Sequence, residues 1–247
     1  MLVSGATWAQ PVVLKFASFE PSQAPFTARV FTTWAEDVTN DSNGTLKIEI
    51  FAGGTLGRNP LQQLKLIQDG VADIAWTIPG YTPGRFDDTE VVELPFLVNN
   101  SLEGSTVLTR MLQKDQLAEW NFVATFKIDE VAQHHMALPL GGTAVMVPML
   151  KSRYDALPPA ARAAIDKHSG EAFVKRFAAV ADGQITAVPE AIAKRGKNTI
   201  VHPDPATQDA FRKAVQPVSE EWRKSRPRNE RVYQLFVEEL ARVRAGK

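Results

Sequence analysis

The sequence predicts an α/β fold with a small parallel sheet and a helical C-terminal part, and three observations support this. Leu46–Phe51 alternates apolar and polar residues, as a half-buried strand does. Strand-like and helix-like patterns alternate over residues 12–76, which is typical of parallel strands joined by helices. A Gly/Pro-rich segment, residues 79–84, then follows the last of these strands, where α/β sheets usually bind ligands.

The first half is expected to form a right-handed βαβαβ unit. Its expected elements are a strand at 12–17, a helix at 26–38, a strand at 46–51, a helix ending near Gly70 and a short strand at 71–76. In the second helix, Leu61, Leu64 and Ile67 are expected to line one side. Gly70 suits the left-handed position that ends a helix.

The second half is expected to be mostly helical. Leu157-Pro158-Pro159 predicts a helix start, because Pro is tolerated in the first turn, and one apolar stripe then continues through Ile165, Phe173, Phe177 and Val180. Lys194-Arg195-Gly196 is typical of a helix end. A strand over 199–202 and helices around 211–222 and 232–243 complete the expected order.

Residues 120–150 contain two further expected strands, His134–Leu138 and Thr143–Val147, separated by Pro139 and Gly141-Gly142. The sequence shows no obvious adjacent strands with which these two would pair in a sheet. Two outcomes stay open: they add to the first sheet, or they make the chain associate with itself.

Composition excludes several classes of protein. The chain has 247 residues, 44% of them hydrophobic, and no net formal charge, which suits one large or two modest domains and argues against a nucleic-acid partner. The basic run Arg223–Arg228 is interpreted as a solvated linker. Without cysteine, disulfides, thiolate catalysis and Cys-based zinc sites are excluded. No stretch approaches eighteen apolar residues, so we expect no membrane span.

Catalytic motifs are missing from the sequence. The four histidines show no metal-ligand spacing, and no serine lies in a Gly-x-Ser-x-Gly elbow. Gly53–Gly57 is rich in glycine but lacks the Lys-Ser/Thr pair of a phosphate-binding loop. We therefore expect a protein that is not an enzyme and needs no cofactor.

A ligand-binding site has better support in the sequence than a catalytic site. Trp76, Tyr81, Phe86 and Phe96 offer an apolar wall with an indole and a phenol donor, although core packing explains the same residues equally well. Arg58 and Arg85 are the cations available for an anionic solute, with Arg85 also a candidate partner of neighbouring acidic residues.

Several segments carry a resemblance to a known family. Gly70–Trp76, Pro83–Phe86 and Glu93-Leu94-Pro95-Phe96 follow the order and spacing of the DctP-type solute receptors of TRAP transporters, which are periplasmic binding proteins. Further matching segments are Phe16-Ala17-Ser18, Trp34–Val38, Asn43-Gly44, Phe51–Gly57 and Tyr154–Pro159.

The resemblance implies a type II periplasmic-binding-protein-like fold, with a parallel or mixed sheet and surrounding helices in each of two lobes. It also implies a function, which is to capture a small organic acid and deliver it to a membrane permease. The loop Ser18–Gln23 would face the cleft. The expected ligand-binding residues are Glu20, Gln23, Arg58, Trp76, Tyr81, Arg85 and Phe96.

The sequence departs from the family between about residues 120 and 127, where on the order of a hundred residues, most of the second lobe, are missing. The family's arginine that clamps a carboxylate is among them. A non-binding remnant or a protein-interaction adapter is therefore the alternative function. The expected divisions are 1–10, the remnant of a signal peptide; 11–119, the first lobe; 120–150, the remnant of the second; and 151–247, the helical region.

The N-terminal segment Leu2–Pro11 resembles the tail of a secretory signal, with small residues before a cut after Ala9 or Gln10. It lacks a basic start and a full apolar core. We expect a periplasmic protein of a Gram-negative bacterium, the leader of a cytosolic protein being the alternative.

Overall fold

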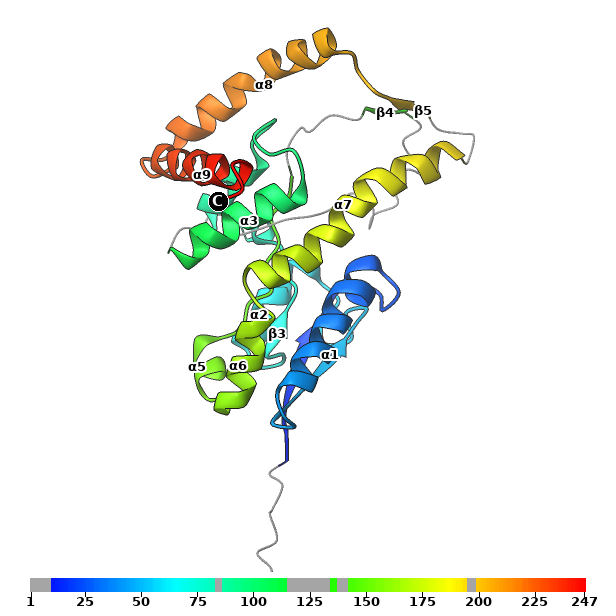
Figure 1. Ribbon diagram of the computed structural model, residues 1–247, viewed down its shortest axis with the longest axis vertical. Coiled ribbons are helices and arrows are strands. Elements are labelled where there is room, and N and C mark those ends of the chain that lie inside the picture. The colour runs from blue at the N-terminus through cyan, green and yellow to red at the C-terminus, as the bar shows by residue number, and fades with distance from the viewer. Residues whose placement is uncertain (1–9, 83–85, 115–133, 137–141, 195–198) are drawn as a thin grey trace, which may run out of the picture. The chain divides into compact units, whose positions relative to one another are not determined.

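The computed structural model (Figure 1) contains three parallel strands in the first part of the chain, β1 Val12–Ala17, β2 Leu46–Phe51 and β3 Ile74–Ala75, which form a sheet in the order β2-β1-β3. The structure describes residues 10–82, 86–114, 134–136, 142–194 and 199–247. The chain divides into two units. Unit 1 comprises Met1–Trp76 and Val147–Ser169, and unit 2 comprises Thr77–Met146 and Gly170–Lys247. The division into lobes expected from the sequence stays a prediction.

All three parallel strands belong to unit 1. Strand β1 is central, with Val12 opposite Leu46 and Phe16 opposite Ile74. The apolar positions of β1 supply much of the core, since Leu14 and Phe16 are fully buried. The parallel strands predicted from the sequence are confirmed, although β3 is shorter than expected.

The helix after β1 begins as a π-helical turn, η1 Thr27–Phe31, and continues as α1 Thr32–Asp41. Its buried residues Phe31, Trp34 and Val38 lie at helical spacing, and α1 packs against β2. The apolar stripe predicted from the sequence therefore covers the sheet, as expected.

The helix before β3 consists of a 3-10 turn, η2 Pro60–Gln62, followed by α2 Gln63–Gln68. The prediction that Leu61 lines the buried side is wrong, because this side chain is 55% exposed while Ile67 is buried. The three-residue repeat of η2 breaks the helical spacing on which the prediction depended. The Asn59 side chain accepts a hydrogen bond from the Leu61 N–H (3.0 Å) and so caps the turn.

The second segment of unit 1 contains α5 Lys151–Asp155 and α6 Pro159–Lys167. Before α5, Met149 forms an isolated antiparallel bridge to Ile74 in β3. In unit 2, Met146 forms a similar single bridge to Thr77. The expected strand over 143–147 is therefore wrong, because single bridges replace a ladder in this segment.

Unit 2 contains two 3-10 segments, four helices and two short strands within the described residues: η3 Pro79–Tyr81, η4 Asp87–Glu93, α3 Ser101–Gln113, β4 His134–Met136, α7 Glu171–Lys194, β5 Thr199–Val201, α8 Pro205–Ser225 and α9 Asn229–Arg244. Helix α3 lies beside α7 and α9 (Figure 1). Its Val107, Leu108 and Met111 join Phe236 and Leu240 of α9 in one core.

The apolar stripe expected to run from Ile165 to Val180 belongs to two helices. Helix α6 ends at Lys167 and α7 begins at Glu171. Between them Gly170 has a φ of +59°, which a helix cannot contain. The predicted helix end at Lys194 is confirmed, and β5, α8 and α9 lie where the pattern placed strands and helices.

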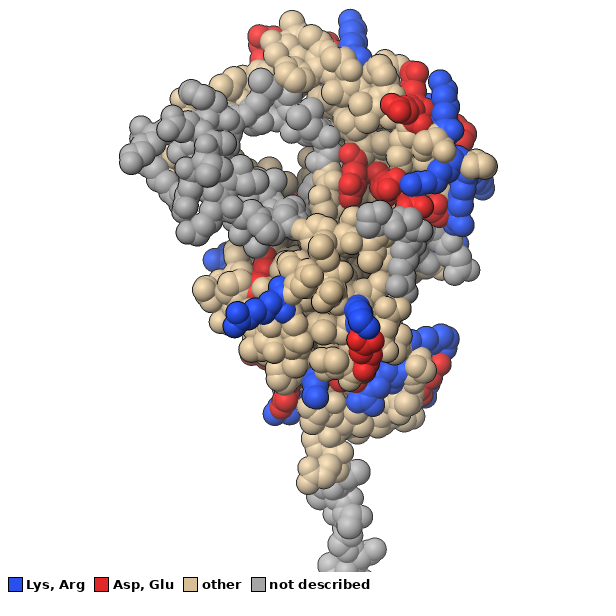
Figure 2. Space-filling view, turned by 180° about the vertical axis from the view of Figure 1, so that it is seen from behind, with Lys and Arg blue, Asp and Glu red and all other residues tan. Residues whose placement is uncertain are grey.

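The interpretation of Arg223–Arg228 as a solvated linker holds only in part, because residues 224–228 are exposed but Arg223–Ser225 belong to α8 and three of the arginines form ion pairs. Arg223 pairs with Glu230 at 2.7 Å, Arg226 with Glu90 at 3.2 Å, and Arg228 with Asp88 at 2.7 Å. The first pair joins α8 to α9, and the other two join the turn between these helices to η4. On the face of the molecule shown in Figure 2, acidic and basic side chains lie next to one another, as such pairing requires.

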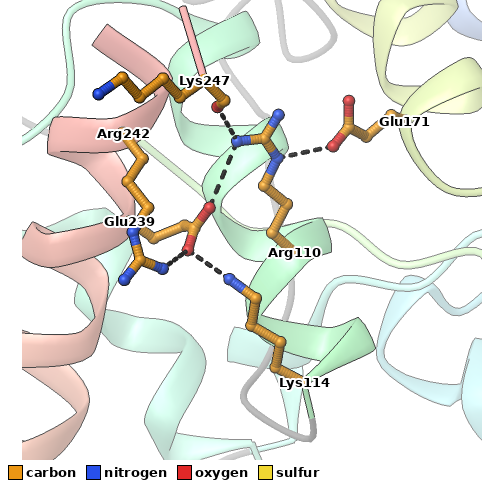
Figure 3. Close-up of polar contacts among 6 residues, drawn as sticks. All are labelled: Arg110, Lys114, Glu171, Glu239, Arg242 and Lys247. Atoms are coloured by element: carbon orange, nitrogen blue, oxygen red, sulfur yellow. Dashed lines mark hydrogen bonds and ion pairs between the residues drawn. The ribbon is translucent and has the colours of Figure 1, made fainter. Parts of the chain in front are cut away.

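A charged cluster joins α3, α7 and α9 within unit 2 (Figure 3). The Glu239 carboxylate accepts hydrogen bonds from Lys114 (2.5 Å), Arg242 (3.0 Å) and Arg110 (3.3 Å), and its side chain is only 6% exposed. Arg110 also donates to Glu171 at 2.6 Å.

Across the helices that the structure describes, none is both long enough and apolar enough to cross a membrane.

Candidate ligand-binding site

The carboxyl ends of the three parallel strands lie at one edge of the sheet of unit 1, which we call the carboxyl edge. The loop Ser18–Gln23 follows β1, the loop Ala52–Asn59 follows β2, and Trp76 directly follows β3. The Trp76 backbone N–H donates to the Ala17 carbonyl at 3.0 Å. This is the position at which α/β sheets usually bind ligands.

Four aromatic rings meet at this edge and form what we call the aromatic cluster. Phe19 stacks on Trp76, with centroids 4.8 Å apart and planes 16° from parallel. Phe31 and Phe26 contact Trp76 at tilted angles, at 5.1 and 5.7 Å. Since rings at these distances attract one another beyond simple burial, the cluster fixes the position of the indole.

The hydrogen bonding of the Trp76 indole N–H is unusual. Its side chain is buried, with the residue 2% exposed, and its Nε1 has no hydrogen-bond partner among the described residues. A buried donor left without an acceptor costs about 1–3 kcal/mol. Such orphaned donors are rare in folded proteins, and a missing acceptor is one explanation for them.

A group of buried polar side chains lies in and behind the loop after β1. Ser18 Oγ and Thr27 Oγ1 are 3.0 Å apart, and Thr27 Oγ1 donates to Glu20 Oε2 at 3.5 Å. The Glu20 N–H donates to Ser18 Oγ at 3.3 Å, and Glu20 itself is 1% exposed. The carboxylate is therefore held within the loop.

The loop after β2 is tied to the loop after β1. The Gly54 N–H donates to the Ser18 carbonyl at 2.9 Å, and the Gly53 N–H donates to the Glu20 carbonyl at 2.6 Å. Both glycines have positive φ, +67° for Gly53 and +71° for Gly54. These two bonds set the shape of the carboxyl edge.

Replacing Gly54 with alanine is expected to destabilise the protein more than replacing Gly53. An alanine in this backbone conformation costs about 1 kcal/mol or more at either position. At Gly54 the added Cβ would also lie 2.8 Å from the Arg58 Cα, whereas at Gly53 it would meet nothing within 4 Å. We expect losses of about 1 kcal/mol for Gly53→Ala and about 2–3 kcal/mol for Gly54→Ala. Urea unfolding of both variants measures the difference, and equal losses would contradict it.

The remaining expected residues of unit 1 lie in the same loops. Gln23 and Arg58 are both exposed, one in the loop after β1 and the other in the loop after β2. The structure therefore places Glu20, Gln23, Arg58 and Trp76 at or beside the carboxyl edge. Their roles toward a ligand stay predictions.

The other expected residues do not belong to unit 1. Tyr81 ends η3 in unit 2, where partial burial raises the pKa of its phenol. Phe96, also in unit 2, has a φ of +60°, and the Arg212 guanidinium lies 4.7 Å from the centre of its ring. Arg85 lies outside the described residues. Ligand contacts by these three residues likewise stay predictions.

Sequence reasoning missed Phe19, Phe26 and Phe31 as neighbours of Trp76. Helical spacing placed Phe26 on a buried face, and Phe19 stands in the loop already expected to face the ligand. Neither observation says which rings stack, because stacking depends on the register between β1 and β3.

The sequence model of the DctP family, described as "Bacterial extracellular solute-binding protein, family 7", matches residues 16–119 and 115–225. The two matched segments overlap at residues 115–119, next to the point, about residues 120 to 127, where the sequence predicts that most of the second lobe is missing. A curated relative, the outer membrane transporter protein TsaT of Comamonas testosteroni, is 31% identical over 143 residues. That alignment covers 56% of this chain and 41% of TsaT, so the chain matches less than half of that relative.

Solved structures of TRAP solute-binding proteins share the fold. One from a marine metagenome, described as specific for aromatic acid ligands and crystallised with 3-hydroxybenzoate, has a TM-score of 0.83 at 22% identity, covering 95% of this chain and 99% of the other. One from Rhodoferax ferrireducens with copurified benzoate has a TM-score of 0.79 at 22% identity, covering 94% and 98%. One from Bordetella bronchiseptica with bound (R)- and (S)-mandelate has a TM-score of 0.77 at 15% identity, covering 94% and 100%. These matches confirm the predicted fold class.

Proposed function

This chain belongs to the DctP family of bacterial extracellular solute-binding proteins, and from that premise we propose that it captures a small organic acid in the periplasm and delivers it to the permease of a TRAP transporter. The family consists of solute receptors, not enzymes. The proposal adds three statements to family membership: the ligand is an organic acid, the protein is located in the periplasm, and it delivers the acid to a permease.

The observation that carries the proposal is the orphaned indole N–H of Trp76 inside the aromatic cluster. A small-molecule site typically combines apolar walls with a few fixed polar groups. The carboxyl edge has this composition. The structures with bound benzoate and 3-hydroxybenzoate support an aromatic acid as the first candidate ligand.

The charge of the acid needs a cationic partner. Arg58, which is exposed beside the carboxyl edge, and Arg85 are the candidates predicted from the sequence. A guanidinium binds a carboxylate through two parallel hydrogen bonds, which gives orientation as well as affinity. We propose that one of these two arginines takes this role in place of the family's arginine, for which the sequence has no counterpart.

A thermal-shift screen of the purified chain tests the proposal. Benzoate, 3-hydroxybenzoate, mandelate, glucuronate and acetate form the panel, with benzyl alcohol as an uncharged control of similar shape. A ligand at a hundred times its dissociation constant adds about 2.7 kcal/mol to the free energy of unfolding. We expect at least one carboxylate, but not benzyl alcohol, to raise the melting temperature. If no carboxylate does so and calorimetry also detects no heat of binding, the proposal is wrong.

The non-binding adapter remains a second candidate, and helix α8 favours it. None of the 21 residues of α8 is buried; Val218 is 52% exposed, and Phe211 and Val215 are partly exposed. Trp222 packs against the core of unit 2 and donates to Glu90, so it is not part of this surface. Exposed apolar side chains that lie together often form a contact surface. A chain that binds no carboxylate and sediments as an oligomer would support the adapter.

A further inference from the structure

Unit 1 contains two buried indoles whose N–H groups differ in one respect. Trp34 and Trp76 are 4% and 2% exposed. The Trp34 Nε1 donates to the His168 carbonyl at 3.2 Å. The Trp76 Nε1 has no acceptor in the part of the chain that the structure describes. The two residues can therefore be compared directly: the Trp34 N–H has an acceptor within the protein, and the Trp76 N–H has none among the described residues.

The Trp76 indole is also held in place by its neighbours. Phe19 covers one face in a nearly parallel stack, and Phe31 and Phe26 contact the ring at tilted angles. Rotation of the side chain to find another acceptor would break these contacts. Because an indole nitrogen donates but never accepts, the missing partner must carry a lone pair.

We propose that the Trp76 Nε1–H donates a hydrogen bond to a carboxylate oxygen of the bound acid, and that the ligand is a planar aromatic carboxylate whose ring extends the aromatic cluster. This inference rests on the proposed function and assigns one atom of the site and one class of ligand. A hydrogen bond to an ionised acceptor is about twice as strong as one between neutral groups. A carboxylate therefore gains more from this donor than a hydroxyl does.

The aromatic class follows from the shape of the cluster. A flat ring can pack against Phe19, which is partly exposed and stacks on Trp76, in the offset or edge-to-face arrangements that aromatic pairs prefer. A saturated ring of the same charge cannot make these contacts. Benzoate is therefore expected to bind more tightly than cyclohexanecarboxylate, which carries the same group on a puckered ring.

The test uses the full chain and two matched variants, Trp76→Phe and Trp34→Phe, each of which keeps an aromatic ring and removes an indole N–H. Calorimetric titration with benzoate and with cyclohexanecarboxylate gives the affinities, and thermal unfolding without ligand gives the stability. For Trp76→Phe we expect benzoate to bind about tenfold to a hundredfold more weakly, because the variant loses one hydrogen bond to a charged group. Its melting temperature should fall less than that of Trp34→Phe, because both substitutions leave a cavity but only Trp34→Phe also removes a satisfied hydrogen bond.

Trp34→Phe is expected to show the larger fall in melting temperature of the two variants, with unchanged affinity for benzoate. If Trp76→Phe binds benzoate as tightly as the unmodified chain, the assignment of the donor is wrong while the proposed function stands. If Trp76→Phe loses as much stability as Trp34→Phe, the donor has a partner within the protein, which also overturns the assignment. Equal affinities of the unmodified chain for the two acids would overturn the aromatic class. If the unmodified chain binds neither acid, this inference is wrong, and the wider carboxylate screen then decides the proposed function.

Discussion

Replacing Phe16 with alanine is expected to lower the free energy of unfolding by about 3–5 kcal/mol. Phe16 lies in β1, the central strand of the sheet in unit 1, and its side chain is fully buried. Its ring lies 5.0 Å from that of Phe31 and 6.1 Å from that of Trp34. The substitution removes both contacts and leaves a cavity between the sheet and α1. Equilibrium unfolding in urea, followed by circular dichroism, measures the loss.

Phe211→Ala is the matched control for this experiment. Phe211 lies in α8, in which no residue is buried, so the same change of side chain leaves no enclosed cavity. We expect less than half the loss seen for Phe16→Ala, because the penalty depends on the volume that cannot collapse. Equal losses would show that the packing around Phe16 is not as described.

Replacing Glu239 with glutamine is expected to cost about 2–4 kcal/mol at pH 7. The nearly buried carboxylate accepts hydrogen bonds from Arg110, Lys114 and Arg242 (Figure 3). Burial alone would raise the pKa of Glu239, but the hydrogen bonds from Lys114 and Arg110 outweigh it and hold that pKa below its ordinary value of 4.5. The glutamine leaves three cations around a neutral amide. Since these cations are partly exposed, the loss is expected near the lower end of the range.

The direction of the pKa shift fixes how this loss depends on pH. A carboxyl group whose pKa is lowered by folding stabilises the protein above its unfolded pKa and loses that contribution as pH falls through the folded pKa. The difference in stability between the unmodified chain and Glu239→Gln should therefore be constant from pH 7 to about 5 and shrink below 4.5. Urea unfolding across this pH range measures it. Glu238→Gln changes an exposed neighbour and is the control; it should lose little stability at any pH. If the stability difference caused by Glu239→Gln persists at low pH, the charged carboxylate is not the group that stabilises the cluster.

The sheet of unit 1 could be predicted because its pattern is local. Strands β1 and β2 begin and end at the expected residues, since alternation and the flanking turns are visible within a few residues. The interruption between α6 and α7 could not be predicted from the apolar stripe, because two successive helices can carry one continuous spacing. Gly170 was the available indication, and its positive φ marks the break.

Features that depend on distant residues were predicted poorly. The run Arg223–Arg228 resembled a linker because its partners Asp88 and Glu90 lie more than 130 residues earlier in the chain. In the candidate site, composition and family resemblance predict Trp76 and Glu20, and the structure places both at the carboxyl edge, while their roles toward a ligand stay predictions. The orphaned state of the Trp76 donor was not predicted, because it depends on what surrounds the indole in space.

The order in which the ribosome makes the chain has a consequence for unit 1. The backbone passes between the units at residues 76–77, 146–147 and 169–170, so each unit is built from two separate stretches of chain. No N-terminal fragment shorter than 169 residues contains all of unit 1, although its three strands are complete by Ala75. At the usual rate of synthesis, those strands wait on the order of ten seconds for α5 and α6. During this interval the side of β3 that later meets Met149 has no covering segment from unit 1, so its backbone N–H and C=O groups on that side lack the bridge that Met149 supplies.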